Sequence, residues 1–265
     1  MKAGSDRGLF GPGSVTWRIS DEPVMWVAGL RAMYLQALHP RTMRATWQNT
    51  AFARPGEAWG RFVRTLEFVR VRTYGSQSEV DRVGRRVRRL HASLTGTDAD
   101  GSVIRLDEPE LLTWVHCGEI GSYVDIAARC GMPLSVGELD RFVAEQRRSA
   151  AVVGLDPAAV PGSVADLDAY FEWMRPQLYL CEEARQALAR SFFPDVPWPL
   201  TGLRLVIPPL NVLALSSLPR WARGLYGMPA LGVTDLSTTL TLRTMYHATT
   251  HVPRRLLGMP ALKAA

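Results

Sequence analysis

The sequence has few of the residues and motifs by which many enzymes can be classified at sight. Its three cysteines, Cys117, Cys130 and Cys181, are widely spaced and form no CxxC pair. This pattern argues against a disulfide framework and a zinc knuckle, and a reducing, cytoplasmic setting is the simplest interpretation. The sequence also contains no GxGxxG, GxxxxGK(S/T), GxSxG or HExxH. The signatures of dinucleotide-binding, P-loop, serine-hydrolase and zinc-protease sites are therefore absent.

Long uninterrupted hydrophobic runs are missing as well. The N-terminus lacks the apolar core of a signal peptide. The apolar run 26–38 contains Arg31 and is too short to cross a bilayer, so it predicts a buried helix. A second apolar run, 200–218, is split by Pro208 and Pro209. We expect no membrane-spanning helix, and we keep the second run as a candidate for peripheral membrane contact or for a contact between two copies of the chain.

The composition favours one large core. The chain has 265 residues, of which 47% are hydrophobic, and no Ser/Gly linker divides it. We expect an irregular arm over residues 1–19 and one helical domain over 20–265. The net charge of +6 comes mainly from arginine. It permits an anionic ligand or surface, but it lacks the focused basic stripe with interleaved aromatics of a nucleic-acid reader.

Helix signals recur along the chain, whereas strand signals do not. Ser76 with Glu79, and Ser135 with Glu138, form capping boxes that start two helices. Residues 107–109 (Asp-Glu-Pro) are typical of another helix start. No period-two alternation is long enough to predict a sheet. The sequence therefore predicts an all-α, single-domain bundle of about eight to ten helices.

The segment 55–96 predicts two consecutive helices with apolar faces. The stripe on the first consists of Trp59, Phe62, Val63, Leu66 and Val69. Arg61 and Thr65 are four residues apart and share a face beside it. The face on the second consists of Val83, Val87, Leu90, His91 and Leu94. The spacing therefore predicts that His91 points inward, while most arginines of that helix lie elsewhere.

Two further histidines also lie on apolar helices. His39 follows the buried run 26–38, and His116 shares a face with Leu112 and Ile120 on the helix that starts near Pro109. A buried imidazole must find a hydrogen-bond partner or a metal. A di-iron carboxylate site is excluded, because no histidine has a glutamate three residues before it. The tail pair, His247 and His251, has the spacing of a helical metal site, but such a pair is more often structural.

A haem is the cofactor that best suits this set of residues. It needs one neutral imidazole as an axial ligand, an apolar slot, and cationic or donor groups at its rim. The inward histidines, with Arg61 and Thr65 on another helix, provide all three. Two interpretations stay open on the residues alone. The histidines can be hydrogen-bonded in the core, and Arg61 can pair with Glu57 while Thr65 bonds back to its own helix.

Four motifs resemble one known family. They are QALHP at 36–40, RFVRT at 61–65, RRLHASLTG at 88–96 and TWVHCGE at 113–119. In this order and spacing they are similar to MpaB-type oxygenases and latex-clearing proteins (rubber oxygenases), over about residues 21–192. The resemblance implies a mostly α-helical fold around a haem-sized core pocket. It also implies a b-type haem that cleaves olefinic carbon–carbon bonds with dioxygen.

The resemblance assigns roles to particular residues. His91 would be the proximal haem ligand, so it is the expected metal ligand. Arg61 and Thr65 would match the arginine and threonine of the distal helix. Rubber oxygenases can place a lysine three residues after that arginine in the distal position. Here Arg64 stands there, and arginine is a poor ligand because it stays protonated.

The other two histidines resemble those of the MpaB-type branch. His39 would serve as a distal ligand or a proton relay, and His116 would orient the haem site. We therefore expect a cytoplasmic haem b-dependent oxygenase or oxidoreductase that acts on a small apolar molecule with dioxygen and binds no nucleic acid. A non-catalytic haem or lipophilic-ligand binding protein, a helical scaffold without cofactor, and a homodimeric assembly remain open.

Overall fold

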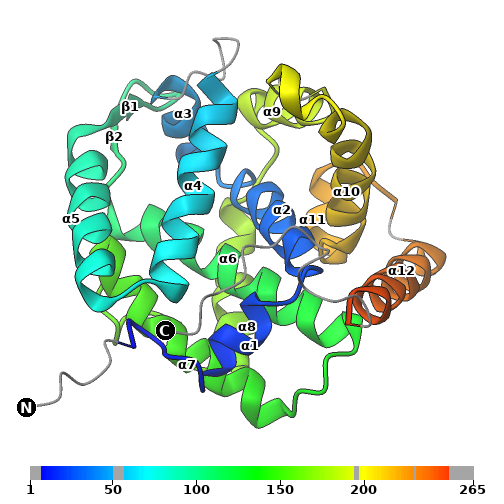
Figure 1. Cartoon of the computed structure of the whole chain (residues 1–265). Helices are drawn as coiled ribbons and strands as arrows, with labels where there is room; N and C mark the ends of the chain where they lie inside the picture. The colour runs from blue at the N-terminus through cyan, green and yellow to red at the C-terminus, as the bar shows by residue number, and fades with distance from the viewer. Residues whose placement is uncertain (1–6, 50–56, 194–196, 230, 251–265) are drawn as a thin grey trace, which may run out of the picture.

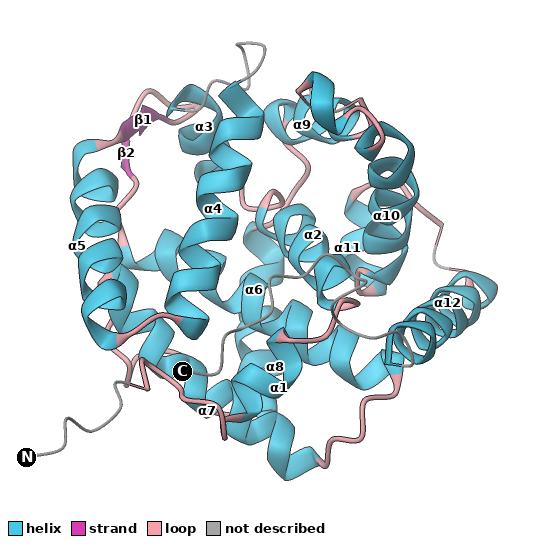
Figure 2. Ribbon diagram, in the orientation of Figure 1, coloured by secondary structure: helices cyan, strands magenta, loops and turns pink. Residues whose placement is uncertain are grey.

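Helices build most of the part of the chain that the structure describes, as expected (Figures 1 and 2). The computed structural model describes residues 7–49, 57–193, 197–229 and 231–250. Within these ranges there are twelve α-helices, of which α1 and α11 have only six residues. The remaining ten match the upper end of the expected number. The α-helices are α1 Val15–Ser20, α2 Met25–Gln36, α3 Pro40–Asn49, α4 Glu57–Tyr74, α5 Gln77–Ser93, α6 Pro109–Cys130, α7 Val136–Val153, α8 Val164–Met174, α9 Glu182–Ser191, α10 Leu203–Ser217, α11 Arg220–Leu225 and α12 Gly232–Thr250.

The N-terminal arm is shorter than expected. Helix α1 begins at Val15, because the Ser14 hydroxyl accepts a hydrogen bond from the backbone N–H of Trp17 and caps it. The buried Glu145 carboxylate also accepts from Thr16, through the backbone N–H at 2.9 Å and the hydroxyl at 2.8 Å. The expectation of an irregular arm through residue 19 was therefore wrong at its C-terminal end.

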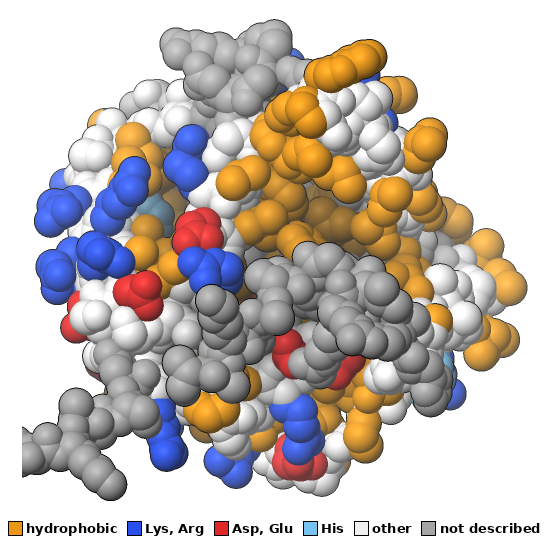
Figure 3. Space-filling view, viewed as in Figure 1, with side chains coloured by type: hydrophobic (Ala, Val, Ile, Leu, Met, Phe, Trp, Pro, Cys, Tyr) orange, Lys and Arg blue, Asp and Glu red, His pale blue; other side chains and the backbone are white. Residues whose placement is uncertain are grey.

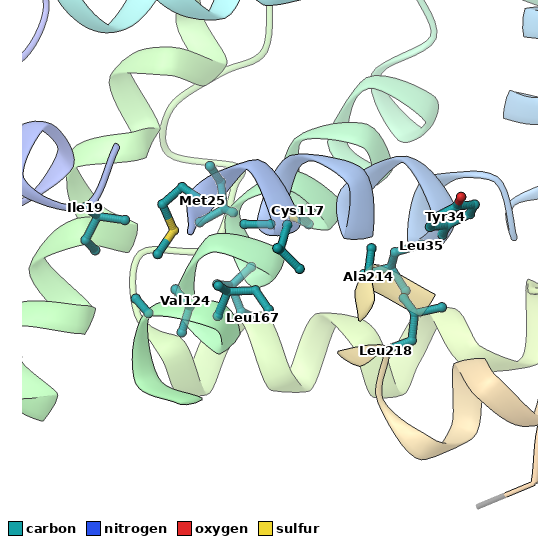
Figure 4. Packing of buried hydrophobic residues seen from close by; sticks show 14 of the residues in the cluster. Ile19, Met25, Tyr34, Leu35, Cys117, Val124, Leu167, Ala214 and Leu218 are labelled. Atoms are coloured by element: carbon teal, nitrogen blue, oxygen red, sulfur yellow. The ribbon is translucent and has the colours of Figure 1, made fainter. Parts of the chain in front are cut away.

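Helix α2 forms the centre of the core, as its composition predicts. Figure 4 shows Leu35 of α2 in one cluster with Cys117 and Val124 of α6, Leu167 of α8 and Ala214 of α10. Helix α6 supplies the largest fully buried side chain, that of Trp114, and its indole N–H donates to the Gln36 carbonyl at 3.0 Å. This bond satisfies a polar atom that would be costly to bury alone. The cysteines Cys117, Cys130 and Cys181 are all buried and free.

Helix α10 continues through two prolines, which corrects the expected break. Pro208 and Pro209 lie inside the helix and remove two backbone donors from it. Helices α2 and α12 both pack against α10, and this tertiary contact keeps the segment helical despite its low propensity. None of the described helices is long and apolar enough to cross a membrane.

A small hairpin joins α5 to α6, although the sequence predicts no sheet. Strands β1 (Thr95–Thr97) and β2 (Val103–Arg105) pair antiparallel, with Gly96 opposite Ile104. Three residues per strand are too few to show alternation in the sequence. Gly96 is buried against α3, where a Cβ atom would lie 2.9 Å from the Cα atom of Ala45. The hairpin therefore fixes the end of α5 against α3.

Candidate active site

The candidate site is built on the helix pair α4 and α5, which a tight turn joins. The predicted capping box is confirmed: the backbone N–H of Ser76 donates to Glu79 Oε2 at 2.8 Å, and the Glu79 N–H donates to Ser76 Oγ at 3.3 Å. At Gly75 a Cβ atom would lie 2.6 Å from the Val71 carbonyl oxygen, so the turn requires glycine. The two helices then run side by side (Figure 1).

The facing apolar sides of α4 and α5 are less covered than the sequence predicts. Val63 is 44% exposed and Leu90 is 52% exposed, although both were expected in buried stripes. The other members of the α4 stripe are half-buried: Trp59, Phe62, Leu66 and Val69. Figure 3 shows hydrophobic side chains recessed between these helices, with basic side chains along the outer edge of α5. The pair thus presents an apolar recess with a basic rim, while a haem-sized pocket stays a prediction.

His91 lies on the inner side of α5, as predicted, but it is only half-buried. Its Nδ1 atom is buried and makes no hydrogen bond. Burial of the ring lowers the pKa of His91, and the nearby positive charge of Arg61 lowers it further. The imidazole is therefore neutral near pH 7, which is the form that binds a metal.

Arg61, on α4, influences His91, on α5, through its charge. Its effect on the pKa of His91 makes the two residues electrostatic neighbours. The pKa of Arg61 is itself lowered, first by burial and then by Arg64. The interaction expected between Arg61 and Glu57 involves a side chain outside the described ones. The positive charge of Arg61 on one helix thus acts on the imidazole of His91 on the other.

Thr65 and Arg64 are both exposed. The Thr65 hydroxyl donates to the Arg61 carbonyl at 3.1 Å, which is the bond back to its own helix that the sequence left open. This bond uses the only proton of the hydroxyl. Neither residue is brought against His91 by any contact in the described part of the chain. Their assigned roles stay predictions.

His39 is almost fully buried at the start of α3. Its Nδ1 atom accepts the backbone N–H of Thr42 at 3.3 Å, and its Nε2 atom lies 4.0 Å from Glu110 Oε1 without a hydrogen bond. Burial, followed by the charge of Arg41, lowers the pKa of His39 to about 4. His39 is thus a neutral imidazole with an unpartnered nitrogen.

His116 lies beside an ion pair that links α6 to α4. Arg72 donates to both carboxylate oxygens of Glu119, at 3.0 Å for the longer bond, and both residues are largely buried. Burial lowers the pKa of His116 to about 4. The negative charge of Glu119 opposes this shift, and the positive charge of Arg72 adds to it. Sequence reasoning missed the role of this pair. The sequence did contain a sign of this pair, because Glu119 is the only acidic residue in the TWVHCGE motif at 113–119.

The structure therefore brings the predicted site residues together in part. The charge of Arg61 acts on His91, and the charges of Glu119 and Arg72 act on His116. Among the described side chains no bond joins His39 to His91, although both lie near the start of α6, where Glu108 acts on His39 and Asp107 on His91. That they share one pocket stays a prediction. Within the described ranges no cluster of three or more His, Cys, Asp or Glu side chains could hold a metal ion, whereas a haem iron needs only one imidazole from the protein.

Comparison with known proteins identifies the family of the chain. The family model described as ER-bound oxygenase mpaB/B'/Rubber oxygenase, catalytic domain, matches residues 16–252. No curated protein and no solved structure matches the chain. The matched region includes both helices of the candidate site and the histidines of α3, α5 and α6. The chain therefore belongs to the mpaB and rubber oxygenase catalytic-domain family.

Proposed function

We propose that the protein is a haem b-dependent oxygenase that acts on a small apolar molecule with dioxygen, and that His91 is the axial ligand. One observation carries the proposal: the His91 imidazole on α5 has a buried Nδ1 atom without a hydrogen-bond partner, and burial lowers its pKa. The oxygenase family to which the chain belongs supports the reaction class. The three free cysteines support a cytoplasmic setting.

The residues present fit a haem. An unpartnered buried imidazole nitrogen costs about 1–3 kcal/mol, and iron coordination would remove the mismatch. The half-buried side chains of α4 and the exposed Leu90 of α5 offer apolar surface to a planar macrocycle. The exposed arginines along α5 offer cations to its carboxylates: Arg82, Arg85, Arg86 and Arg89.

The chain's own residues would prepare the reaction space. When bound, the haem supplies a redox-active iron that activates dioxygen. Arg61 would donate hydrogen bonds to negative charge that develops during the reaction, because its guanidinium stays charged. His39 would hold or pass a proton at Nε2, where no protein partner competes. His116 and the Arg72–Glu119 pair would hold α6 at a fixed distance from α4, and the apolar walls would exclude water.

The test is haem titration of the purified chain. The wild-type protein should bind one haem with a Soret band, and His91→Ala should lose stoichiometric binding while it keeps its helical circular-dichroism signal. His247→Ala is the matched control, since His247 is exposed on α12. A full Soret band in His91→Ala would show that another residue binds the haem iron, and His116 would be tested next. Dioxygen consumption with an alkene then separates an oxygenase from a non-catalytic haem-binding protein.

A further inference from the structure

Helices α10 and α12 each expose several aliphatic side chains, although polar residues of the same helices are buried. On α12, Val233, Leu236 and Leu240 follow helical spacing and are 69%, 61% and 53% exposed. The buried residues of that helix are Thr238 and Leu242. A helix that packs only against its own protein normally shows the opposite arrangement.

Helix α10 repeats this inversion. Leu205 and Val212 lie two turns apart and are 82% and 53% exposed, whereas Asn211 and Ser217 are buried. The Asn211 amide donates to the Ser191 carbonyl of α9 at 2.7 Å, and the Ser217 hydroxyl donates to the Ala214 carbonyl of its own helix at 2.7 Å, so both buried polar side chains are satisfied within the chain. The exposed apolar side is therefore the side left for a partner.

Two aromatic side chains extend this surface. Phe193, after α9, is 86% exposed, and Trp198, before α10, is 88% exposed. Figure 3 shows hydrophobic side chains along the edge of the molecule that α10 and α12 form. We call this surface the apolar edge, and its members are Phe193, Trp198, Leu205, Val206, Val212, Val233, Leu236 and Leu240. Apolar surface of this extent marks an interaction site.

The charges around the apolar edge are cationic. From residue 196 to the C-terminus the sequence contains a single acid, Asp235. Its carboxylate already accepts from Arg220 at 2.8 Å and from Arg223. The exposed Arg204 precedes Leu205, and the exposed Arg243 stands three residues after Leu240. Asp195 lies in the sequence between Phe193 and Trp198, outside the residues that the structure describes. Among the described residues from 197 to 250, this surface carries exposed arginines, and its one acid is already paired.

We propose that the apolar edge docks on the surface of an anionic lipid bilayer. Tryptophan and phenylalanine insert at the boundary between headgroups and acyl chains, and arginine can remain at headgroup level on its long side chain. A second copy of the chain fits less well. A symmetric contact on this edge would bring arginines of one copy toward those of the other, while the described acid of this segment, Asp235, is already paired within its own copy. The proposal does not depend on haem binding.

The test is flotation of the full-length protein with phosphatidylcholine vesicles, with and without phosphatidylserine. The wild type should float, and more strongly with phosphatidylserine. The double variant Trp198→Ala, Leu205→Ser should lose about tenfold or more in binding, because it removes two inserted side chains. Arg243→Gln should weaken binding by about fivefold, with phosphatidylserine only. Trp173→Ala is the control, since Trp173 is 60% exposed on α8, outside the apolar edge.

Equal binding by the double variant and the wild type would overturn the proposal, as would a wild type that stays unbound. Analytical ultracentrifugation without vesicles tests whether a second copy of the chain, rather than a bilayer, covers the apolar edge. A dimer that the double variant dissociates would assign the apolar edge to a second copy. The substituted side chains are exposed, so thermal unfolding of the variants should match the wild type and exclude misfolding as the cause.

Discussion

Arg72 of α4 and Glu119 of α6 form a two-point ion pair whose side chains are only 7% and 17% exposed. The pair lies beside His116. Burial alone would raise the pKa of Glu119, but the charge and hydrogen bonds of Arg72 outweigh this effect and keep that pKa lowered. It is the clearest polar connection between the helix that carries Arg61 and the core helix α6.

Removal of one partner from this pair should destabilise the fold. Arg72→Met leaves the Glu119 carboxylate buried and unpaired, so we expect a loss of about 3–5 kcal/mol in the free energy of unfolding, measured by urea denaturation. Arg70→Met is the matched control, because Arg70 pairs with Glu67 at the surface, where both side chains are more than half exposed. The control should lose less than about 1 kcal/mol. Equal losses in both variants would show that the buried Arg72–Glu119 pair contributes no more to stability than the exposed Arg70–Glu67 pair.

The two buried histidines with a pKa of about 4 should make the protein acid-sensitive. His39 and His116 are neutral in the fold but protonate near pH 6.5 when unfolded. The unfolded state therefore binds more protons below pH 6.5, and stability falls as the pH drops from about 6.5 toward 4. Between pH 7 and pH 5 each histidine should contribute a loss on the order of 2 kcal/mol.

Denaturant unfolding at the two pH values checks this expectation. His116→Gln should remove about half of the pH-dependent loss, and His247→Gln, at an exposed position, should leave it unchanged. A wild type with the same stability at pH 7 and pH 5 would show that these imidazoles are not held neutral by burial.

Arg61 should affect both catalysis and the titration of His91. We expect Arg61→Ala to keep haem and fold but to lower turnover about 100-fold or more, the scale of one preorganised donor. In the haem-free protein, NMR titration should show a higher pKa for His91, because the positive charge that lowers it is gone. An unchanged pKa would show that Arg61 does not face His91, whatever happens to turnover.

Thr65 should matter much less than Arg61. Its hydroxyl already donates to the Arg61 carbonyl, so Thr65→Val removes a local bond rather than a donor that faces His91. We expect less than about threefold change in turnover, and Thr65→Ser should match the wild type. A 100-fold loss in Thr65→Val, rescued by serine, would restore the catalytic role that the resemblance implies.

Gly96 should be required for the close packing of the β1–β2 hairpin against α3. In Gly96→Ala the new methyl group meets the Ala45 backbone at 2.9 Å, so we expect a loss of about 1–3 kcal/mol in unfolding free energy. Gly137→Ala is the control: nothing lies within 4 Å of its added Cβ atom on α7, and helix propensity favours alanine. If both variants unfold at the same denaturant concentration, the hairpin does not pack closely on α3.

The sequence by itself determined the features that depend on neighbours along the chain. The capping boxes at Ser76 and Ser135 start α5 and α7 as predicted, because the capping atoms lie within three residues of each other. The burial of α2 followed from its apolar composition. The inner position of His91 followed from helical spacing, and the four motifs identified the family.

Only the tertiary structure decided how those helices are covered. It exposes Leu90 and Val63, continues α10 through Pro208 and Pro209, and pairs Arg72 with Glu119. Each of these outcomes depends on an element distant in sequence, whose position no local pattern encodes. Periodicity tells which side of a helix is apolar, but the distance to the facing helix decides whether that side is packed core or the wall of a recess.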